Sequence, residues 1–240
     1  HTSLLFASYH FLAGNKHGFM RNRSCQTNLV AFYEEVSRNL DAGMAVDVIY
    51  LDFAKAFDTV PHRWLMIKLR NIGLEHNICI RDQAASWFSS YLSNRSFSVA
   101  LANKSSTPVP LSVGEHQGSV LGPLLFSLYT FSLGDLISSF GLKYHLYADD
   151  IQIFLDTPAL TTDVQTQIAN CLLAISSWMN RRQLKLNLAK NMPLSFTIGR
   201  NNINAKYLLN GSLFGVSLME KDLGFFVDNK LSKPYYVQIE

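Results

Sequence analysis

The chain has 240 residues, of which 48% are apolar and 16% charged, and its formal net charge is +3. This composition excludes an intrinsically disordered protein and allows one large domain or two small ones. Gly122 and Pro123 interrupt the longest apolar run and no secretory signal is visible, so we expect no membrane association. Three cysteines without a Cys-x-x-Cys pair predict neither disulfides nor zinc, and favour an intracellular protein of nucleus and cytoplasm.

Charge is distributed unevenly along the chain. No acidic residue lies between Asp163 and Glu220, and none lies within Gln83–Gly114. Segments of one sign suit contact with a phosphate backbone, although a solvated basic face is an equal alternative. The basic residues of the two segments are Arg95, Lys104, Arg181, Arg182, Lys185, Lys190, Arg200 and Lys206.

The first half of the chain predicts helices around one apolar strand. Ser24–Ala42 has apolar residues at helical spacing and is followed by a glycine. Ala45–Phe53 (AVDVIYLDF) is rich in β-branched and aromatic residues, which predicts a strand buried on both faces. Pro61 is suited to a first helical turn. Further helices are expected at Pro61–Gly73 and Arg81–Leu92, and strands at Phe97–Ala102 and Val109–Val113.

The second half predicts two more helices and several short strands. Val120–Ser139 predicts one buried helix, and Lys143–Leu155 predicts two strands joined by a tight turn at Ala148–Asp150. Thr162–Asn180 has an apolar helical stripe, and Thr162 with Gln165 matches a capping box. Short strands are expected over 184–227, with turns near Gly199 and at Asn210–Gly211. Helices packed on one face of an antiparallel sheet define an α+β fold.

Two carboxylate positions stand out against their apolar surroundings. Asp52 ends the strand AVDVIYLDF, and Asp149–Asp150 lies in the turn of the hairpin LYADDIQIF. A buried carboxylate is costly unless it is paired or binds a metal. Two Mg²⁺ ions ~3.5–4 Å apart could activate a 3′-hydroxyl and stabilise a leaving pyrophosphate. From the residues alone, a polar turn and a strand-end cap are the commoner explanations.

Six motifs occur in an order and spacing typical of one polymerase family. They are KHGFMRNRSCQTNL at 16–29, LDFAKAFDTVPH at 51–62, HQGSVLGPLLFSLY at 116–129, YADD at 147–150, WMNRRQLKLNLAK at 178–190 and KDLGFFVD at 221–228. Together they resemble the reverse transcriptases of non-LTR (long interspersed element) retrotransposons, over nearly the whole chain. The resemblance implies an RNA-directed DNA polymerase with a polymerase palm, which transfers dNTPs onto a primer 3′-hydroxyl by a two-metal mechanism.

The resemblance also implies which residues hold the metal ions. Asp52 matches the first carboxylate ligand, and the carbonyl of Phe53 is a further oxygen donor. Asp149 matches the ligand that bridges the two ions, and Asp150 is the adjacent acid nearer the primer end. Lys190 matches a lysine that protonates the departing pyrophosphate, although an ordinary surface lysine is equally consistent. The implied cofactor is a pair of Mg²⁺ ions, for which Mn²⁺ can substitute.

Three residues match positions that contact the incoming dNTP. Phe57 corresponds to a steric gate that excludes a 2′-hydroxyl, although a core phenylalanine is the simpler explanation from periodicity. Gln117 and Gly118 correspond to a pair that lies along the incoming nucleotide and the template. Glycine suits that position because a backbone without a Cβ can approach a ligand closely.

Contacts with nucleic acid are implied at three places. Leu223–Gly224 matches a turn that supports the primer strand. Arg21 and Arg23 are expected to contact the template or guide RNA backbone, and Arg181 and Arg182 belong to an acid-free segment. The implied partners are therefore an RNA template, a DNA primer, dNTPs and the element's own RNA in a ribonucleoprotein.

Several positions depart from the family pattern. Glu115–His116 replaces the usual Val-Pro, which removes a rigid φ and adds a negative charge near the triphosphate. Asn191 replaces the usual Thr or Ser, and Met20 replaces an arginine. We expect a partial fingers segment at 1–43, a palm with interleaved fingers elements at 44–215, and a primer-grip hairpin with a truncated thumb at 216–240.

Three hypotheses remain open from the sequence. The first is an active polymerase palm that is part of a longer protein. The second is a decayed remnant that at most binds RNA, which the substitutions and the expected truncation favour. The third is a different palm polymerase, either a group II intron maturase or an RNA-synthesising enzyme, and the ring of Phe57 argues against RNA synthesis because it would exclude the ribose.

Overall fold

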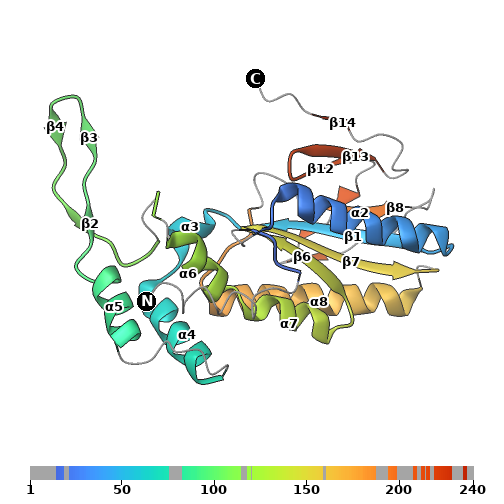
Figure 1. The fold of residues 1–240 in the computed structure, drawn as a ribbon, viewed down its shortest axis with the longest axis horizontal. Helices are drawn as coiled ribbons and strands as arrows, with labels where there is room; N and C mark the ends of the chain where they lie inside the picture. Colours follow the sequence, from blue (N-terminus) through green and yellow to red (C-terminus); the bar gives the residue numbers. More distant parts are fainter. Residues whose placement is uncertain are drawn as a thin grey trace.

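A five-stranded sheet forms the centre of the computed structural model (Figure 1). The structure describes residues 15–18, 22–75, 83–114, 118–119, 121–158, 161–187, 194–198 and 219–228, and short strands at 208–209, 212–213, 215–216 and 235–236. The sheet order is β11-β8-β1-β7-β6. Its strands are β1 (Ala45–Asp52), β6 (Lys143–Tyr147), β7 (Asp150–Thr157), β8 (Leu194–Ile198) and β11 (Gly215–Val216). The β11–β8 pair is parallel and the other pairs are antiparallel.

Helix α2 (Cys25–Asp41) covers one face of this sheet. Ser24 is its N-cap: the Ser24 hydroxyl accepts from the Thr27 backbone N–H, and the Thr27 hydroxyl accepts from the Ser24 N–H. Phe32 and Val36 are fully buried against the even-numbered side chains of β1 and β7, including Phe154. The predicted helix over Ser24–Ala42 and the predicted buried strand over Ala45–Phe53 are both confirmed.

The opposite face is covered by α6 (Gly122–Tyr129), α7 (Ser132–Ser139) and α8 (Thr162–Arg181). Odd-numbered residues of β1 and β7, such as Ile49 and Ile153, enter this larger core. Sequence reasoning expected one helix over Val120–Ser139, which is wrong because the helix breaks at Thr130–Phe131.

The break coincides with a contact from a distant part of the chain. The Nζ of Lys16 donates to the Ser127 carbonyl at 2.6 Å, and an uninterrupted helix would give that carbonyl to the backbone N–H of Phe131. The Phe131 N–H donates instead to the Leu128 carbonyl at 3.4 Å. A side chain 111 residues away therefore binds a carbonyl at the end of α6, a contact that no local pattern could indicate.

The start of α8 also differs from the sequence prediction. Thr161 is the N-cap, and its hydroxyl accepts from the Val164 N–H at 3.3 Å. The capping box predicted from Thr162 and Gln165 is therefore wrong, because the N-cap lies one residue earlier and Val164 has no side-chain acceptor to complete a box. The rest of α8 agrees with its predicted apolar stripe, since Ile168, Leu172 and Ile175 are buried.

A lobe of helices and a long exposed hairpin extends from one end of the sheet (Figure 1). It contains α3 (Ala56–Thr59), α4 (His62–Glu75) and α5 (Gln83–Leu92). The hairpin, which we call the arm, runs over residues 96–110 and is paired as β2 (Ser96–Phe97) with β5 (Val109–Pro110) and β3 (Ala100–Leu101) with β4 (Lys104–Ser105). The two strands predicted here are thus shorter and interrupted.

The C-terminal part forms small sheets of its own. β9 (Leu208–Leu209) pairs with β10 (Ser212–Leu213) in an antiparallel hairpin. The turns predicted at Asn210–Gly211 and near Gly199 lie outside the described residues. β12 (Met219–Asp222) pairs with β13 (Phe225–Asp228), which pairs with β14 (Tyr235–Tyr236). The predicted α+β class is confirmed, but the prediction that helices pack on one face of the sheet is wrong, because α2 covers one face and α6, α7 and α8 cover the other. No helix in the described part of the chain is long and apolar enough to cross a membrane.

Candidate active site

The two predicted carboxylate positions meet at one end of the central sheet. Asp52 is the last residue of β1 and lies directly opposite Asp150, the first residue of β7. Both positions are even-numbered, and even-numbered residues of these strands face α2 rather than the larger core. Asp149 lies in the two-residue turn that joins β6 to β7. Directly opposed residues have Cβ atoms ~4.5–5.5 Å apart, so the register places the two side chains within reach of each other.

The turn that carries Asp149 is conformationally strained. Ala148 has φ 55°, a left-handed value that costs a non-glycine residue about 1–2 kcal/mol. On one side of the turn, the Phe53 N–H donates to the Asp149 carbonyl at 3.4 Å. Strain of this kind persists only where surrounding contacts hold it, and it is frequent at functional sites.

The other side of the turn is held by Gly18. A Cβ at Gly18 would overlap the backbone nitrogen of Ala148 and lie 3.0 Å from its Cα. The segment 15–18 reaches this position because it pairs with the edge of β6: Leu146 N–H donates to the Asn15 carbonyl, and His17 N–H donates to the Leu146 carbonyl, both at 2.8 Å. Sequence reasoning missed Gly18, although the glycine of the KHGFM motif was a visible signal.

Lys16 anchors the same segment to the end of α6. Its Nζ is buried and donates to the Ser127 carbonyl and, at 3.3 Å, to the Thr130 hydroxyl. Burial lowers the pKa of Lys16 to about 7. The Arg23 guanidinium donates to the Lys16 carbonyl at 2.9 Å, so this predicted template-binding residue also supports the segment.

Asn187 holds Asp52 from the segment that follows α8. Its Nδ2 donates to Asp52 Oδ2 at 3.0 Å, and its backbone N–H donates to the Asp52 carbonyl at 2.9 Å. The Ala54 N–H also donates to the Lys185 carbonyl at 2.8 Å, so residues 185–187 extend the sheet beside β1. Sequence reasoning missed Asn187 because the contact spans 135 positions. Lys190, three residues further on, lies outside the described residues.

Phe57 lies at the start of the lobe, on α3. Its half-buried ring packs against Phe126 with 4.9 Å between ring centroids, and Phe126 also meets Phe53 edge-on. The ring is therefore held by core contacts without being fully enclosed. Gly118 is exposed and has φ 82°, a value suited to glycine, while Gln117 lies outside the described residues.

The basic residues predicted to bind nucleic acid differ in their surroundings. Arg181 is exposed at the end of α8. The guanidinium of Arg182 lies over the Trp178 ring at 4.1 Å and donates to the Ser132 hydroxyl at 3.1 Å, so it joins α8 to α7. The nucleic-acid role of both residues stays a prediction. Arg21 lies outside the described residues.

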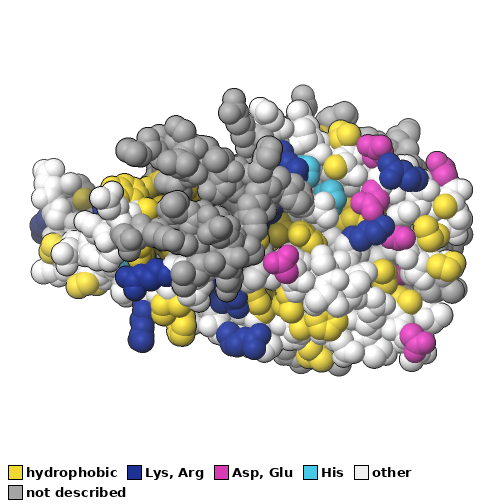
Figure 2. All heavy atoms as spheres, turned by 60° about the horizontal axis from the view of Figure 1, so that its bottom comes forward, with side chains coloured by type: hydrophobic (Ala, Val, Ile, Leu, Met, Phe, Trp, Pro, Cys, Tyr) yellow, Lys and Arg dark blue, Asp and Glu magenta, His cyan; other side chains and the backbone are white. Residues whose placement is uncertain are grey.

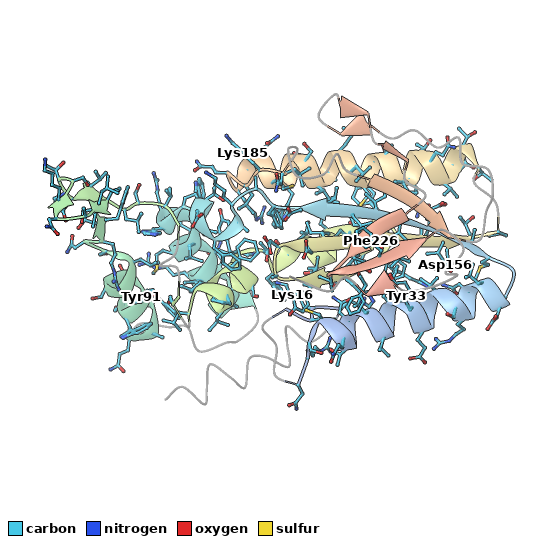
Figure 3. All side chains as sticks on the ribbon, turned by 90° about the horizontal axis from the view of Figure 1, so that it is seen from above. Lys16, Tyr33, Tyr91, Asp156, Lys185 and Phe226 are labelled. Atoms are coloured by element: carbon cyan, nitrogen blue, oxygen red, sulfur yellow. The ribbon has the colours of Figure 1, made fainter. Side chains whose placement is uncertain are left out.

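The predicted primer-supporting turn forms the tip of the β12–β13 hairpin. Leu223 has φ 45° and Gly224 has φ 97°, which are the signs of a two-residue type I′ turn. The buried carboxylate of Asp222 accepts from the Tyr33 hydroxyl at 3.1 Å and from Gln152. Figure 3 shows Tyr33 on α2 beside this hairpin. Burial and then the Asp222 charge raise the pKa of Tyr33, so its O–H remains a donor.

The donors at the end of β1 and β7 are of the kind that Mg²⁺ prefers. Among the described residues, however, no three His, Cys, Asp or Glu side chains are gathered closely enough to form a metal site. The backbone register brings Asp52 and Asp150 together. To bind one cation jointly, their carboxylate groups would have to rotate from the conformations that the structure shows. The type of oxygen donor and the position of the strands thus suit a divalent cation, whereas the side-chain conformations do not form a complete ligand set.

Comparison with known proteins identifies the family. The family model "Reverse transcriptase (RNA-dependent DNA polymerase)" matches residues 5–207. The chain belongs to the reverse transcriptase family, and the resemblance to the enzymes of non-LTR retrotransposons is confirmed.

Curated relatives agree with this assignment. The chain is 25% identical over 232 residues to a probable RNA-directed DNA polymerase from transposon BS of Drosophila melanogaster, covering 92% of the chain and 24% of the relative. It is 27% identical to the RNA-directed DNA polymerase from mobile element jockey of Drosophila funebris, covering 76% of the chain and 20% of the relative. The chain therefore spans between a fifth and a quarter of these relatives' length.

Solved structures support the fold. The apo telomerase of Candida tropicalis, truncated from its C-terminal domain, aligns with a TM-score of 0.67 at 12% identity, covering 98% of this chain and 44% of that one. Telomerase of Candida albicans in complex with a fragment of telomeric RNA aligns with a TM-score of 0.55 at 14% identity. At this identity the likeness concerns the fold alone.

Proposed function

We propose that this chain carries the nucleotidyl-transfer centre of an RNA-directed DNA polymerase, in which Asp52 and Asp149 are the principal metal ligands and Asp150 is the adjacent acid. The observation that carries the proposal is the register of β1 and β7, in which Asp52 directly opposes Asp150 beside the strained turn of Asp149. Family membership supplies the reaction class, which is transfer of dNTPs onto a primer 3′-hydroxyl.

Divalent cations, Mg²⁺ or Mn²⁺ in its place, would lower the pKa of the attacking hydroxyl and neutralise charge on the leaving pyrophosphate. The chain's own contribution is to keep anionic oxygens at the sheet end. Asn187 fixes one oxygen of Asp52, Oδ2, by a hydrogen bond. Phe53, through its carbonyl, is a further oxygen donor at the same end.

The remaining roles concern substrate and template. Phe57 would exclude a ribose 2′-hydroxyl, and Gln117 and Gly118 would lie along the incoming dNTP. Lys190 would protonate the pyrophosphate. Leu223 and Gly224 would support a DNA primer, while Arg21, Arg23, Arg181 and Arg182 would contact the template backbone. Intracellular action, in nucleus and cytoplasm, and assembly with the element's RNA follow from the same proposal.

We also propose the domain limits expected from the sequence: fingers at 1–43, palm at 44–215 and primer-grip with the start of a thumb at 216–240. Contacts cross both limits: α2 packs on β1, and β11, which spans the second limit, pairs with β8. Since the chain spans between a fifth and a quarter of its curated relatives' length, the activity of the whole protein belongs to this proposal.

The test is primer extension on an RNA template with dNTPs and Mg²⁺, using the chain within its complete reading frame. Asp52→Asn and Asp149→Asn should each lower incorporation by at least about a hundredfold, the scale for losing one electrostatic group from an active site. Asp163→Asn, at an exposed acid on α8, is the matched control. Salt-sensitive RNA binding without incorporation would support the decayed remnant instead.

The steric gate has a separate test. Phe57→Val should raise the incorporation of ribonucleotides relative to deoxyribonucleotides by about tenfold or more, because a smaller side chain leaves room for the 2′-hydroxyl. Leu121→Val, at another half-buried side chain packed on the same core, controls for loosened packing. Unchanged sugar selectivity would contradict the gate.

A further inference from the structure

One side of α5 carries an aromatic and basic ladder. The rings of Trp87 and Tyr91 are stacked, with 5.5 Å between centroids and 10° between planes. The Arg95 guanidinium carbon lies 4.8 Å from the Tyr91 ring centroid, and its Nε donates to the Tyr91 carbonyl at 2.7 Å. The three groups follow one another at intervals of four residues, so they form one continuous stripe along the helix and its end.

The ladder faces solvent. Trp87 is 52% exposed and Arg95 is exposed, and the next aromatic residue along the chain, Phe97, is 50% exposed. A tryptophan that served only the core would be expected to bury more of its ring. Packing of the protein core does not explain why aromatic and basic side chains are exposed together on one face.

The sequence segment that carries the ladder holds charges of one sign. Residues 83–114 contain no Asp or Glu. Figure 2 shows exposed hydrophobic and basic side chains over this lobe, whereas the acidic side chains in view lie toward the other end of the molecule. A nucleic-acid strand carries a negative charge at every phosphate, so charge complementarity favours it over a protein surface of mixed charge.

The ladder is connected to the Gln-Gly loop. The Tyr91 hydroxyl and the Ser119 hydroxyl are 2.6 Å apart, and Ser119 directly follows Gly118. The same hydroxyl of Ser119 accepts from the Leu121 N–H at 3.2 Å, at the start of α6. Figure 3 shows Tyr91 on α5, in the lobe beyond the sheet end. A strand bound along the ladder would therefore lead toward the loop assigned to the incoming nucleotide.

We propose that the Trp87–Tyr91–Arg95 ladder binds the unpaired stretch of the RNA template before it enters the polymerase site. An RNA base stacks on the exposed Trp87 ring, and the outer guanidinium nitrogens of Arg95 contact a phosphate. Base stacking on an aromatic side chain is tolerant of sequence, which suits a surface that a moving template must pass. The proposal rests on the assigned polymerase function, because that function supplies the single-stranded template.

The test measures RNA binding without requiring turnover. Fluorescence anisotropy measures the affinity of the full chain for two labelled ligands. One is a 12-nucleotide single-stranded RNA that cannot pair with itself, and the other is the same RNA annealed to its complement. Trp87→Leu should weaken binding of the single strand about 5- to 100-fold, whereas Trp87→Phe keeps a stacking ring and should restore most of the affinity. Trp64→Leu is the matched control, because Trp64 is 41% exposed on α4 and lies outside the ladder.

Arg95→Gln provides a second variant that does not depend on the tryptophan. It should reduce the slope of log affinity against log salt by about 0.7, the contribution of one phosphate contact on a single strand. Loss confined to the single strand supports the proposal. Equal losses for Trp87→Leu and Trp64→Leu, an unchanged affinity, or an effect of Trp87→Leu on self-association instead of RNA binding would each overturn it.

Failure of the ladder and failure of the polymerase are separable. Asp52→Asn should abolish incorporation and leave RNA binding intact, because the ladder does not include the carboxylates. If Trp87→Leu leaves binding unchanged while the wild-type protein incorporates dNTPs, the ladder proposal alone fails. If binding depends on Trp87 and no incorporation occurs, the polymerase proposal alone fails.

Discussion

The central sheet and the arm are both built from β-strands, yet the side chains of the sheet are mostly buried and those of the arm are exposed. Val46, Val48, Ile49 and Leu51 of β1 are all buried, because helices or a hairpin cover both faces of the sheet. Every residue of the arm over 96–110 is exposed, including Leu101 at 80%. The sheet therefore holds its side chains in fixed positions, whereas the arm exposes its side chains to solvent.

The difference explains where precise chemistry can be located. Asp52 and the Asp149 turn are held by contacts from Phe53, Gly18 and Asn187, each from a different segment. Side chains of the arm have no comparable network, so they suit contacts that tolerate movement. This division agrees with the two proposals, in which nucleotidyl transfer occurs at the end of the sheet and an RNA strand is bound at the lobe from which the arm extends.

The first prediction tests the comparison directly, with matched truncations in the two regions. Phe154→Ala removes a ring that meets Phe32 edge-on at 5.2 Å in the core, and should cost about 3–5 kcal/mol of the free energy of unfolding. Leu101→Ala on the arm should change it by no more than about 0.5 kcal/mol. Urea unfolding measures both, and similar losses would refute the distinction.

The second prediction concerns the strained turn. In Gly18→Ala the new methyl group would displace the Ala148 backbone, and a shift of about 1 Å at the catalytic groups can lower the rate about a hundredfold. Primer extension, normalised to folded protein, measures the loss. Gly43→Ala is the control, because Gly43 has φ 77° but no atom within 4 Å of an added Cβ. It should lose stability and keep its specific activity.

The third prediction separates positioning from general packing at Asn187. Asn187→Leu removes the hydrogen bond to Asp52 Oδ2, and loss of such a supporting contact lowers metal affinity or activity about 10- to 100-fold. The Mg²⁺ concentration for half-maximal incorporation should rise by a similar factor. Asn180→Leu, at an exposed position on α8, should change neither quantity. An unchanged Mg²⁺ requirement in Asn187→Leu would show that Asn187 serves packing alone.

The fourth prediction is a pH dependence of the free energy of unfolding that comes from Lys16. Its pKa falls from 10.5 in the unfolded chain to about 7 in the fold, so between these values the unfolded chain binds an extra proton. Stability should therefore rise with pH in this window, by at most about 1.4 kcal/mol per pH unit. Lys16→Met should remove this contribution, whereas Lys104→Met on the arm should retain it. Urea unfolding between about pH 7 and pH 9 measures the difference.

Much of the fold follows from local patterns. The strand at Ala45–Asp52, the helix begun by Ser24 and the turn between β6 and β7 all appear where spacing and caps predict them. The errors occur where distant residues intervene. The helix predicted over Val120–Ser139 is divided where Lys16 binds the carbonyl of Ser127, and no periodicity within that segment contains this information.

The sequence by itself determined the family, the α+β class and the acidic residues proposed for catalysis, because these depend on motifs and on short-range periodicity. Only the tertiary structure decided which residues support those acids. Gly18 reaches Ala148, and Asn187 reaches Asp52, across more than half the chain. Such contacts depend on how the sheet closes, since burial and hydrogen-bond satisfaction select among many partners that look alike in sequence.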